Sequence, residues 1–165
     1  MTTALNIYKY NLIDAVKNRS FLESKTLGKE AVKERDFRGR NALYWALKNN
    51  ASHNVNLLIA YGTSLMVTYE KHALFHAVEC GHYSMVALLM RRGLDINMED
   101  DCGKTPLMYA IESKNFAIVK YLVEYGADLY LMDYELDMAD NYAKKCGCKT
   151  INNYIERAVY FDMFA

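Results

Sequence analysis

Apolar residues recur at helical spacing in short segments that are separated by turn residues. In the clearest segment Leu107, Ala110 and Ile111 fall at i, i+3 and i+4, so they share one face of a helix. A more apolar stretch follows from 116 to 123 and ends shortly before Gly126. The pattern predicts two short helices joined by a turn and followed by a loop.

The predicted helices carry residues that helix ends prefer. Gly103 suits a tight turn, Thr105 is a favourable N-cap, and Pro106 fits the first helical position, where its missing N–H costs no hydrogen bond. Asn115 interrupts the apolar pattern, and Gly126 is typical of the residue that follows a helix. Because neither helix is long enough to be stable alone in water, we expect the pair to pack against similar pairs.

An alanine and a glycine recur along the chain at a constant separation. The pairs are Ala46 and Gly62, Ala77 and Gly93, and Ala110 and Gly126. The alanines follow one another at nearly equal steps, and the same steps lead back to Ala15 and on to Ala143. This spacing predicts five units on one plan, with the two-residue differences in connecting loops.

The repeated unit resembles the ankyrin repeat, whose pattern is a T-P-L-H-x-A start and a G-A-D end. The matching residues of the best copy are Thr105, Pro106, Leu107, Ala110, Gly126, Ala127 and Asp128. The resemblance covers nearly the whole chain and implies an all-α ankyrin-repeat solenoid of helix-turn-helix units joined by hairpin loops. It implies a single domain at 1–165, with an N-terminal cap unit at 1–35, repeats at 36–66, 67–99 and 100–132, and a C-terminal cap repeat at 133–165.

The copies depart from the family pattern at several positions. His72 and Ala73 replace the usual Thr-Pro, so we expect that helix start to lose its preferred cap. Phe75 and Met108 stand where the family usually has a histidine. Residues 21–35 fit the second helix of the first unit only loosely, as is expected of an end unit.

Composition narrows the classes of partner. Lys and Arg number 20 and Asp and Glu number 20, so the chain lacks the basic excess of nucleic-acid binders, and we expect no nucleic-acid partner. No apolar run reaches the ~18–20 residues of a membrane span, and no secretory signal is visible, so we expect a cytoplasmic protein without a membrane partner. The four cysteines lack metal-site or disulfide spacing and are expected to be reduced thiols.

The sequence lacks a recognisable catalytic or metal-binding pattern. His72 and His76 stand four residues apart but without the glutamate of an H-E-x-x-H arrangement, so we interpret His76 as a packing residue. His82 follows Gly81 at the turn between helices, where the family usually has a structural histidine. Phosphate-binding glycine loops and nucleophile elbows are missing as well. We therefore predict no enzyme activity, no cofactor and no metal site.

The resemblance implies a binding surface. In ankyrin proteins the hairpin tips and the exposed face of each first helix form a concave recognition surface. At the matching positions this chain has Phe37, Arg38, Arg40, Lys48, Thr68, Tyr69, Lys71, Glu79, Asp101, Lys104, Glu112, Tyr134, Glu135 and Asp137. We expect these residues to bind a partner protein.

Two features of this set favour recognition over a merely solvated face. Phe37, Tyr69 and Tyr134 are large aromatic residues at tip positions where we expect no folding need for them, and aromatic side chains dominate binding energy at interfaces. Basic residues gather at the first copy and acidic residues toward the last, an arrangement that orients a partner.

The sequence therefore predicts a non-catalytic protein-interaction module that acts as an adaptor, inhibitor or effector. We expect a monomer that works in the cytoplasm, or in the host cytosol if its source is a bacterium or a virus. The alternative is a targeting or regulatory fragment of a larger enzyme. The apolar stretch at 160–165 lacks an obvious polar cap, so we expect it either to fold back on the last helix pair or to have continued into a further part. A purely structural spacer is disfavoured because it needs no aromatic residues at its tips.

Overall fold

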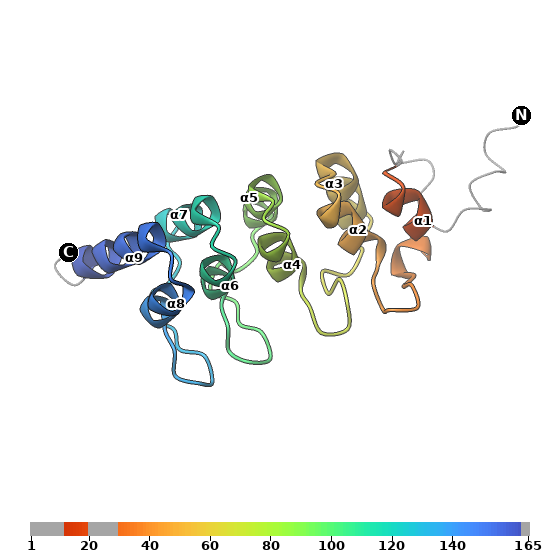
Figure 1. The fold of residues 1–165 in the computed structure, drawn as a ribbon. Helices are drawn as coiled ribbons and strands as arrows, with labels where there is room; N and C mark the ends of the chain where they lie inside the picture. Colours follow the sequence, from red (N-terminus) through yellow and green to blue (C-terminus); the bar gives the residue numbers. More distant parts are fainter. Residues whose placement is uncertain (1–11, 20–29, 163–165) are drawn as a thin grey trace, which may run out of the picture. The chain divides into compact units, whose positions relative to one another are not determined.

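The computed structural model describes residues 12–19 and 30–162, and the regular elements within them are helices (Figure 1). The α-helices are α1 (Leu12–Lys17), α2 (Ala42–Lys48), α3 (Ser52–Ala60), α4 (Ala73–Glu79), α5 (Tyr83–Arg91), α6 (Pro106–Glu112), α7 (Phe116–Glu124), α8 (Ala139–Cys146) and α9 (Lys149–Asp162). A short 3₁₀ segment, η3, covers Ala31–Lys33. The predicted all-α fold is confirmed. Most of the loosely fitting segment 21–35 lies outside the described residues.

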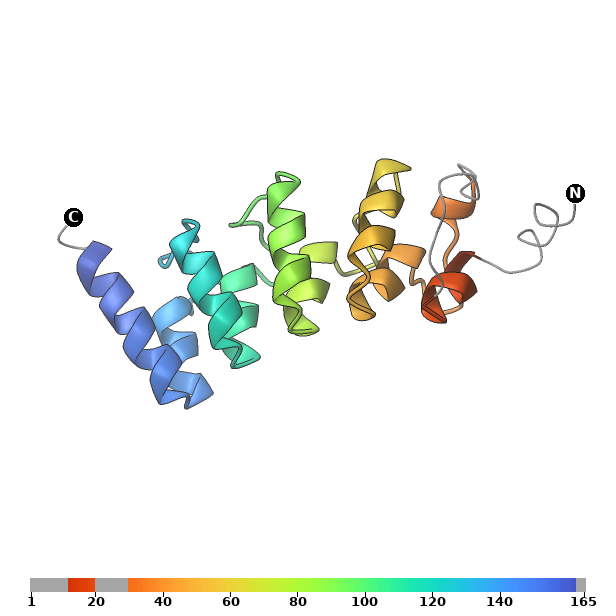
Figure 2. The ribbon, with the colours of Figure 1, turned by 90° about the horizontal axis from the view of Figure 1, so that it is seen from above.

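The chain divides into two compact units, residues 1–88 and 89–165. The first unit contains α1 to α4 and most of α5, and the second contains the end of α5 and α6 to α9. Within the units the helices of one repeat lie side by side: α2 with α3 in the first, and α6 with α7 and α8 with α9 in the second (Figures 1 and 2). These pairs are the predicted helix-turn-helix units.

The starts of the first helices show how local sequence sets the helix boundaries. Thr105 Oγ1 accepts a hydrogen bond from the N–H of Met108 at 3.4 Å, and Pro106 occupies the first turn, as predicted. The helix start one repeat upstream lacks the preferred Thr-Pro, as predicted, but it is still capped. His72 Nδ1 accepts from the N–H of Leu74 at 3.3 Å, because a ring nitrogen with a lone pair can take the role of the usual hydroxyl oxygen.

The five-unit spacing is also present in the backbone. In each of the five repeats, a single residue shortly after the end of the first helix has a φ between 53° and 70°. These residues are Arg19, Asn50, Gly81, Lys114 and Gly147. They follow one another at the same steps as the alanines. A left-handed residue at this place ends one helix and turns the chain toward the next.

A hairpin loop precedes each first helix from α2 onward. Each hairpin is closed by an N–H that donates to the carbonyl oxygen four residues later at 2.8–3.1 Å. The donors are Asp36, Val67, Asp100 and Asp133. Val67 lies five residues after Gly62, whereas Asp100 lies seven residues after Gly93. The missing pair of residues therefore falls in the loop that leads into the hairpin, as predicted.

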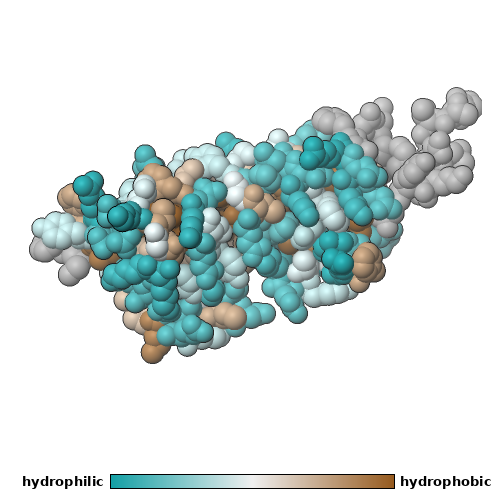
Figure 3. Space-filling view, in the orientation of Figure 1, coloured by the Kyte–Doolittle hydropathy of each residue, from teal (hydrophilic) through white to brown (hydrophobic). Residues whose placement is uncertain are grey.

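The predicted apolar faces form the core of each unit. In the second unit Leu107, Ala110, Ile111, Ile118 and Leu122 are all 1% exposed or less. Large fully buried side chains of the first unit include Leu43, Leu47, Leu58 and Leu74. Burying a leucine side chain contributes about 1.5–3 kcal/mol, so this shared core holds the short helices together. The outer surface in Figure 3 is mostly hydrophilic, with hydrophobic atoms at the lower ends of some hairpins.

Candidate functional site

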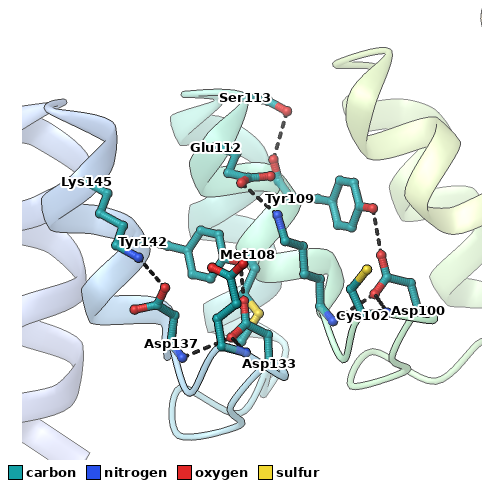
Figure 4. Close-up of polar contacts among 12 residues, drawn as sticks. Asp100, Cys102, Met108, Tyr109, Glu112, Ser113, Asp133, Asp137, Tyr142 and Lys145 are labelled. Carbon is teal, nitrogen blue, oxygen red and sulfur yellow. Dashed lines mark hydrogen bonds and ion pairs between the residues drawn. The ribbon is translucent and has the colours of Figure 1, made fainter.

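A buried aspartate ties the last hairpin to α8. Asp133 Oδ1 accepts hydrogen bonds from the N–H groups of Glu135 and Asp137, both at 2.9 Å. Its Oδ2 accepts from the hydroxyl of Tyr142 at 2.5 Å (Figure 4). Burial alone raises the pKa of Asp133, but these hydrogen bonds outweigh it and hold the pKa below 3.8. The carboxylate therefore fixes both the hairpin and its angle to the helix.

The same arrangement occurs in two other hairpins with one change. Asp100 Oδ2 accepts from the hydroxyl of Tyr109 at 2.7 Å, and the two residues lie nine positions apart, like Asp133 and its tyrosine (Figure 4). In the first unit Asp36 Oδ2 instead accepts from Arg40 Nε at 2.8 Å. The hairpins thus present their tips on a framework that the sequence repeats.

Two of the predicted tip aromatics pack against glycines. A Cβ atom built on Gly39 would lie 2.3 Å from the Tyr69 ring, and one on Gly103 would lie 2.9 Å from the Tyr134 ring. Each ring therefore lies directly against the glycine of the preceding hairpin, and Tyr134 N–H also donates to the Cys102 carbonyl at 3.0 Å. Both aromatics therefore also pack within the protein, a contact that the sequence did not indicate. Their outer surfaces stay accessible, since each side chain is 74% exposed.

Two other tip residues are exposed and apolar. Phe37 is 89% exposed, with the Arg38 guanidinium 5.4 Å from its ring centroid. Leu136, which the sequence analysis missed, is 74% exposed and has a φ of 64°. It stands one repeat after Gly103, whose φ is 77°, and this spacing was the signal that could have found it. A leucine in the left-handed region costs roughly 1–2 kcal/mol of backbone strain.

Charged residues at the hairpins and first helices pair within their own repeats. The partners are eight residues apart in sequence, and in the third pair the order of the charges is reversed. The pairs are Lys71–Glu79, Lys104–Glu112 and Asp137–Lys145. Exposed pairs of this kind contribute about 0.2–1 kcal/mol each. They also neutralise part of the acidic charge that was predicted for the later repeats, at Glu112 and Asp137.

The remaining predicted tip residues differ in role. Thr68 Oγ1 accepts from the N–H groups of Glu70 and Lys71 at 3.3 and 3.0 Å, so Thr68 shapes its turn. Asp101 and Glu135 are exposed in their hairpins. Both acids are therefore placed where a partner can reach them.

His82, between α4 and α5, links two neighbouring repeats. His82 Nε2 lies 3.1 Å from the carbonyl oxygen of Lys48, and Ser84 Oγ donates to Asn50 Oδ1 at 2.8 Å. Both contacts join the start of α5 to the end of α2 and its turn. His82 has the structural role that was predicted for it.

His76 is a packing residue, as predicted. It is 5% exposed, and its ring stacks on Tyr44 with 4.1 Å between the ring centroids. Burial lowers the pKa of His76 to about 4, and the nearby charge of Glu79 opposes that shift only in part. His76 is therefore neutral in the folded protein at physiological pH.

Lowering the pH from about 7 to about 4.5 is expected to destabilise the protein through His76. Unfolded histidine binds a proton with a pKa near 6.5, whereas folded His76 does so only near 4. The contribution of the neutral ring is complete above pH 6.5 and is lost as the pH falls toward 4. We expect the free energy of unfolding to fall by roughly 2–3 kcal/mol more than in His76→Phe, as measured by chemical denaturation at each pH.

His76→Phe is a suitable reference because it keeps an aromatic ring against Tyr44. Asp36 and Asp133 have pKa values below 3.8, so their contributions are lost at lower pH and do not enter this window. Equal pH slopes in the two proteins would show that His76 does not titrate as its burial requires.

Residues 12–19 and 30–162 meet the requirements of neither a metal site nor a membrane-spanning helix. Within these ranges His, Cys, Asp and Glu form no group of three or more that could hold a metal ion. The same residues include no helix that is both long and apolar enough to cross a bilayer. The four cysteines are free thiols.

Known proteins share the repeat. A family model for ankyrin repeats in three copies matches residues 3–100 and 68–133. The chain is 31% identical over 120 residues to interferon antagonist OPG040 of vaccinia virus, a match that covers 73% of this chain and 40% of that protein. Interferon antagonist OPG039 of monkeypox virus is 29% identical over the same length, with the same 73% and 40% coverage. A putative ankyrin repeat-containing protein of Treponema pallidum is 29% identical over 113 residues, 67% of this chain and 38% of that protein.

The matches and the geometry agree. The chain spans about two fifths of the length of these relatives. Ankyrin repeats mediate protein–protein interaction, and the family is typically non-catalytic. The helix pairs, the hairpins and the repeated left-handed residue all follow the matched pattern. The chain therefore belongs to the ankyrin-repeat family.

Proposed function

We propose that this protein is a non-catalytic module that binds a partner protein through its hairpin tips and the exposed faces of its first helices. The observation that carries the proposal is Leu136. Leu136 exposes apolar surface to water, and its left-handed backbone is strained, whereas Gly103 occupies the matching position in the preceding hairpin. Neither feature contributes to the stability of the fold. Phe37, 89% exposed at another tip, supports the same reading.

In this proposal residues 1–165 act as one ankyrin-repeat domain that is monomeric on its own. Relatives that are named interferon antagonists favour an effector or inhibitor over a passive scaffold. Such a protein works in the cytoplasm, and for an effector this is the cytosol of the host. The partner is a protein rather than a nucleic acid because the chain has no net charge.

The double variant Phe37→Ala/Leu136→Gly tests the proposal. A protein captured from cell lysate by the wild type is purified, and its dissociation constant is measured against both proteins. We expect the double variant to bind about tenfold more weakly or worse. Its melting temperature should stay equal or rise, because Phe37 is exposed and glycine relieves the strain at position 136. Tyr69 and Tyr134 are left in place because they pack on glycines.

Phe161→Ala is the matched control, since Phe161 is 68% exposed but lies in the last turn of α9, a second helix. We expect its affinity to equal that of the wild type. Unchanged binding by the double variant, or an equal loss in the control, would show that the tips are not the recognition surface.

A further inference from the structure

The first repeat has two cations where the next three repeats have an ion pair. Arg40 and Lys48 stand eight residues apart, at the positions that Lys71 and Glu79 occupy one repeat later. Arg40 Nε donates a hydrogen bond to Asp36 Oδ2 in the hairpin. Lys48 is exposed and forms no ion pair with any residue that the structure describes. The carboxylate that completes the pair in the next two repeats is missing from the first.

A third cation joins them around Trp45. The Arg40 guanidinium carbon lies 4.4 Å from the centroid of this ring, and the Lys17 and Lys48 ammonium nitrogens lie at 5.2 and 5.4 Å. Lys17 comes from α1, so the cluster combines α1, α2 and the hairpin before α2, all within the first unit. Asp36 offsets one of the three charges. Residues Lys17, Arg40, Trp45 and Lys48 are called the Trp45 cluster below.

The indole N–H of Trp45 is also unsatisfied. Trp45 lies nine residues after Asp36, where the second unit has Tyr109 and Tyr142, whose hydroxyls donate to their hairpin aspartates. The Asp36 oxygen that would accept this hydrogen bond is taken by Arg40 Nε. Trp45 is 8% exposed, and its Nε1 is buried without a hydrogen-bond partner among the described residues. A buried donor without an acceptor destabilises the folded protein, and the repulsion between the cations is a second unfavourable effect at the same place.

We propose that the Trp45 cluster binds an acidic segment of the partner protein. A carboxylate of that segment takes the place that Glu79 and Glu112 hold in the next two repeats, between the hairpin cation and the end of the first helix. It pairs with Lys48 and Lys17, which are both exposed. This inference rests on the proposed function and specifies the chemistry of the partner.

An acidic peptide fits this cluster better than a nucleic acid does. The charge is local: the chain as a whole has 20 basic and 20 acidic residues, so it offers no extended basic path for a phosphate backbone. A few cations around one aromatic ring suit one or two carboxylates. Peptide binding at this site should weaken as salt screens the charges.

Trp45 reports on its own site because it is the one tryptophan in the sequence. The full chain is titrated with a short synthetic peptide of alternating Glu and Gly, and tryptophan fluorescence is recorded. We expect a saturable change, and we expect about a tenfold rise in the dissociation constant between about 0.05 M and about 0.5 M salt. The same peptide with Gln in place of Glu should cause no saturable change.

Lys48→Glu supplies the missing carboxylate from within the chain and so should compete with the peptide. We expect its dissociation constant to rise about tenfold or more, and Lys17→Glu should act in the same direction. Lys149→Glu makes the same charge change at the first residue of α9 and should bind the peptide as the wild type does. Circular dichroism checks that each variant keeps its helices.

The inference is overturned by equal binding of the Gln peptide, by unchanged binding in Lys48→Glu, or by no saturable change with the Glu peptide. A saturable change caused only by an oligothymidylate probe also overturns it and assigns the cluster to nucleic-acid phosphates. The fate of the proposed function is separate. If the peptide does not bind but Phe37→Ala/Leu136→Gly no longer binds the captured partner, the proposed function is supported and the acidic-segment inference is rejected. If the peptide binds but the double variant still binds the partner, the cluster binds acidic peptides and the hairpin tips are not the recognition surface.

Discussion

Replacing Leu122 with alanine is expected to lower the free energy of unfolding by about 2–5 kcal/mol. Leu122 is fully buried in α7, which packs against both α6 and α9. The substitution removes buried methyl groups and leaves a cavity between helices. Since the units of a repeat protein contact only their neighbours, no larger core is present to close around that cavity. Chemical denaturation of the full chain measures the loss.

The chain offers a control with the identical chemical change. Leu136→Ala removes the same atoms from a side chain that is 74% exposed, so we expect a change within about 0.5 kcal/mol. Similar losses for the two variants would contradict the burial of Leu122 and, with it, the packing of α7 on its neighbouring helices.

The helices could be predicted because their signals are local. Thr105 and Pro106 define the start of α6, and Gly126 follows the end of α7, through backbone preferences that depend on a few adjacent residues. The repeat spacing then carried the same assignment to copies with weaker signals. The cap that His72 provides could not be predicted in detail, because cap preferences rank residue types, whereas its ring nitrogen reaches the Leu74 N–H through one particular side-chain geometry.

The contacts between hairpins could not be predicted from local sequence. Tyr69 meets Gly39, and Tyr134 meets Gly103, although almost a whole repeat of chain separates the partners in each case. Exposure alone marks such an aromatic as a binding residue, and its packing role becomes visible only when the neighbouring hairpin is in place. Exposure is a better guide to partner binding at Phe37, which is 89% exposed.

The candidate surface shows the same division. The tip and helix positions followed from the resemblance, but the charges at these positions acquire meaning only in pairs. Lys104 and Glu112 looked like two independent binding residues, whereas the structure joins them at 2.9 Å. Comparison of equivalent pairs then distinguishes the first repeat, where Arg40 pairs with Asp36 and Lys48 has no ion-pair partner among the described residues. Leu136 was missed because an apolar residue at a glycine position draws attention only when its φ is known.

Replacing Asp133 with alanine is expected to cost about 3 kcal/mol of unfolding free energy, the second large effect. Asp133 is 3% exposed, and its carboxylate accepts three hydrogen bonds, two from the hairpin backbone and one from Tyr142. Without it the Tyr142 hydroxyl stays buried with no acceptor, and the hairpin that presents Tyr134 and Leu136 loses its anchor. Partner affinity should therefore fall together with stability, unlike in Phe37→Ala/Leu136→Gly.

The contribution of the tyrosine can be separated by a double-mutant cycle. Tyr142→Phe removes the hydroxyl alone and should cost about 1–2 kcal/mol, and in the Asp133→Ala background it should cost almost nothing, because the lost bond is shared. Asp101→Ala, at an exposed hairpin residue, is the control and should change stability by less than about 0.5 kcal/mol. Additive losses at Asp133 and Tyr142, measured by urea denaturation, would mean that the carboxylate does not hold the hairpin to α8. The hairpin would then have to be held by its other contacts, among them the packing of Tyr134 on Gly103 and the hydrogen bond from the Tyr134 N–H to the Cys102 carbonyl.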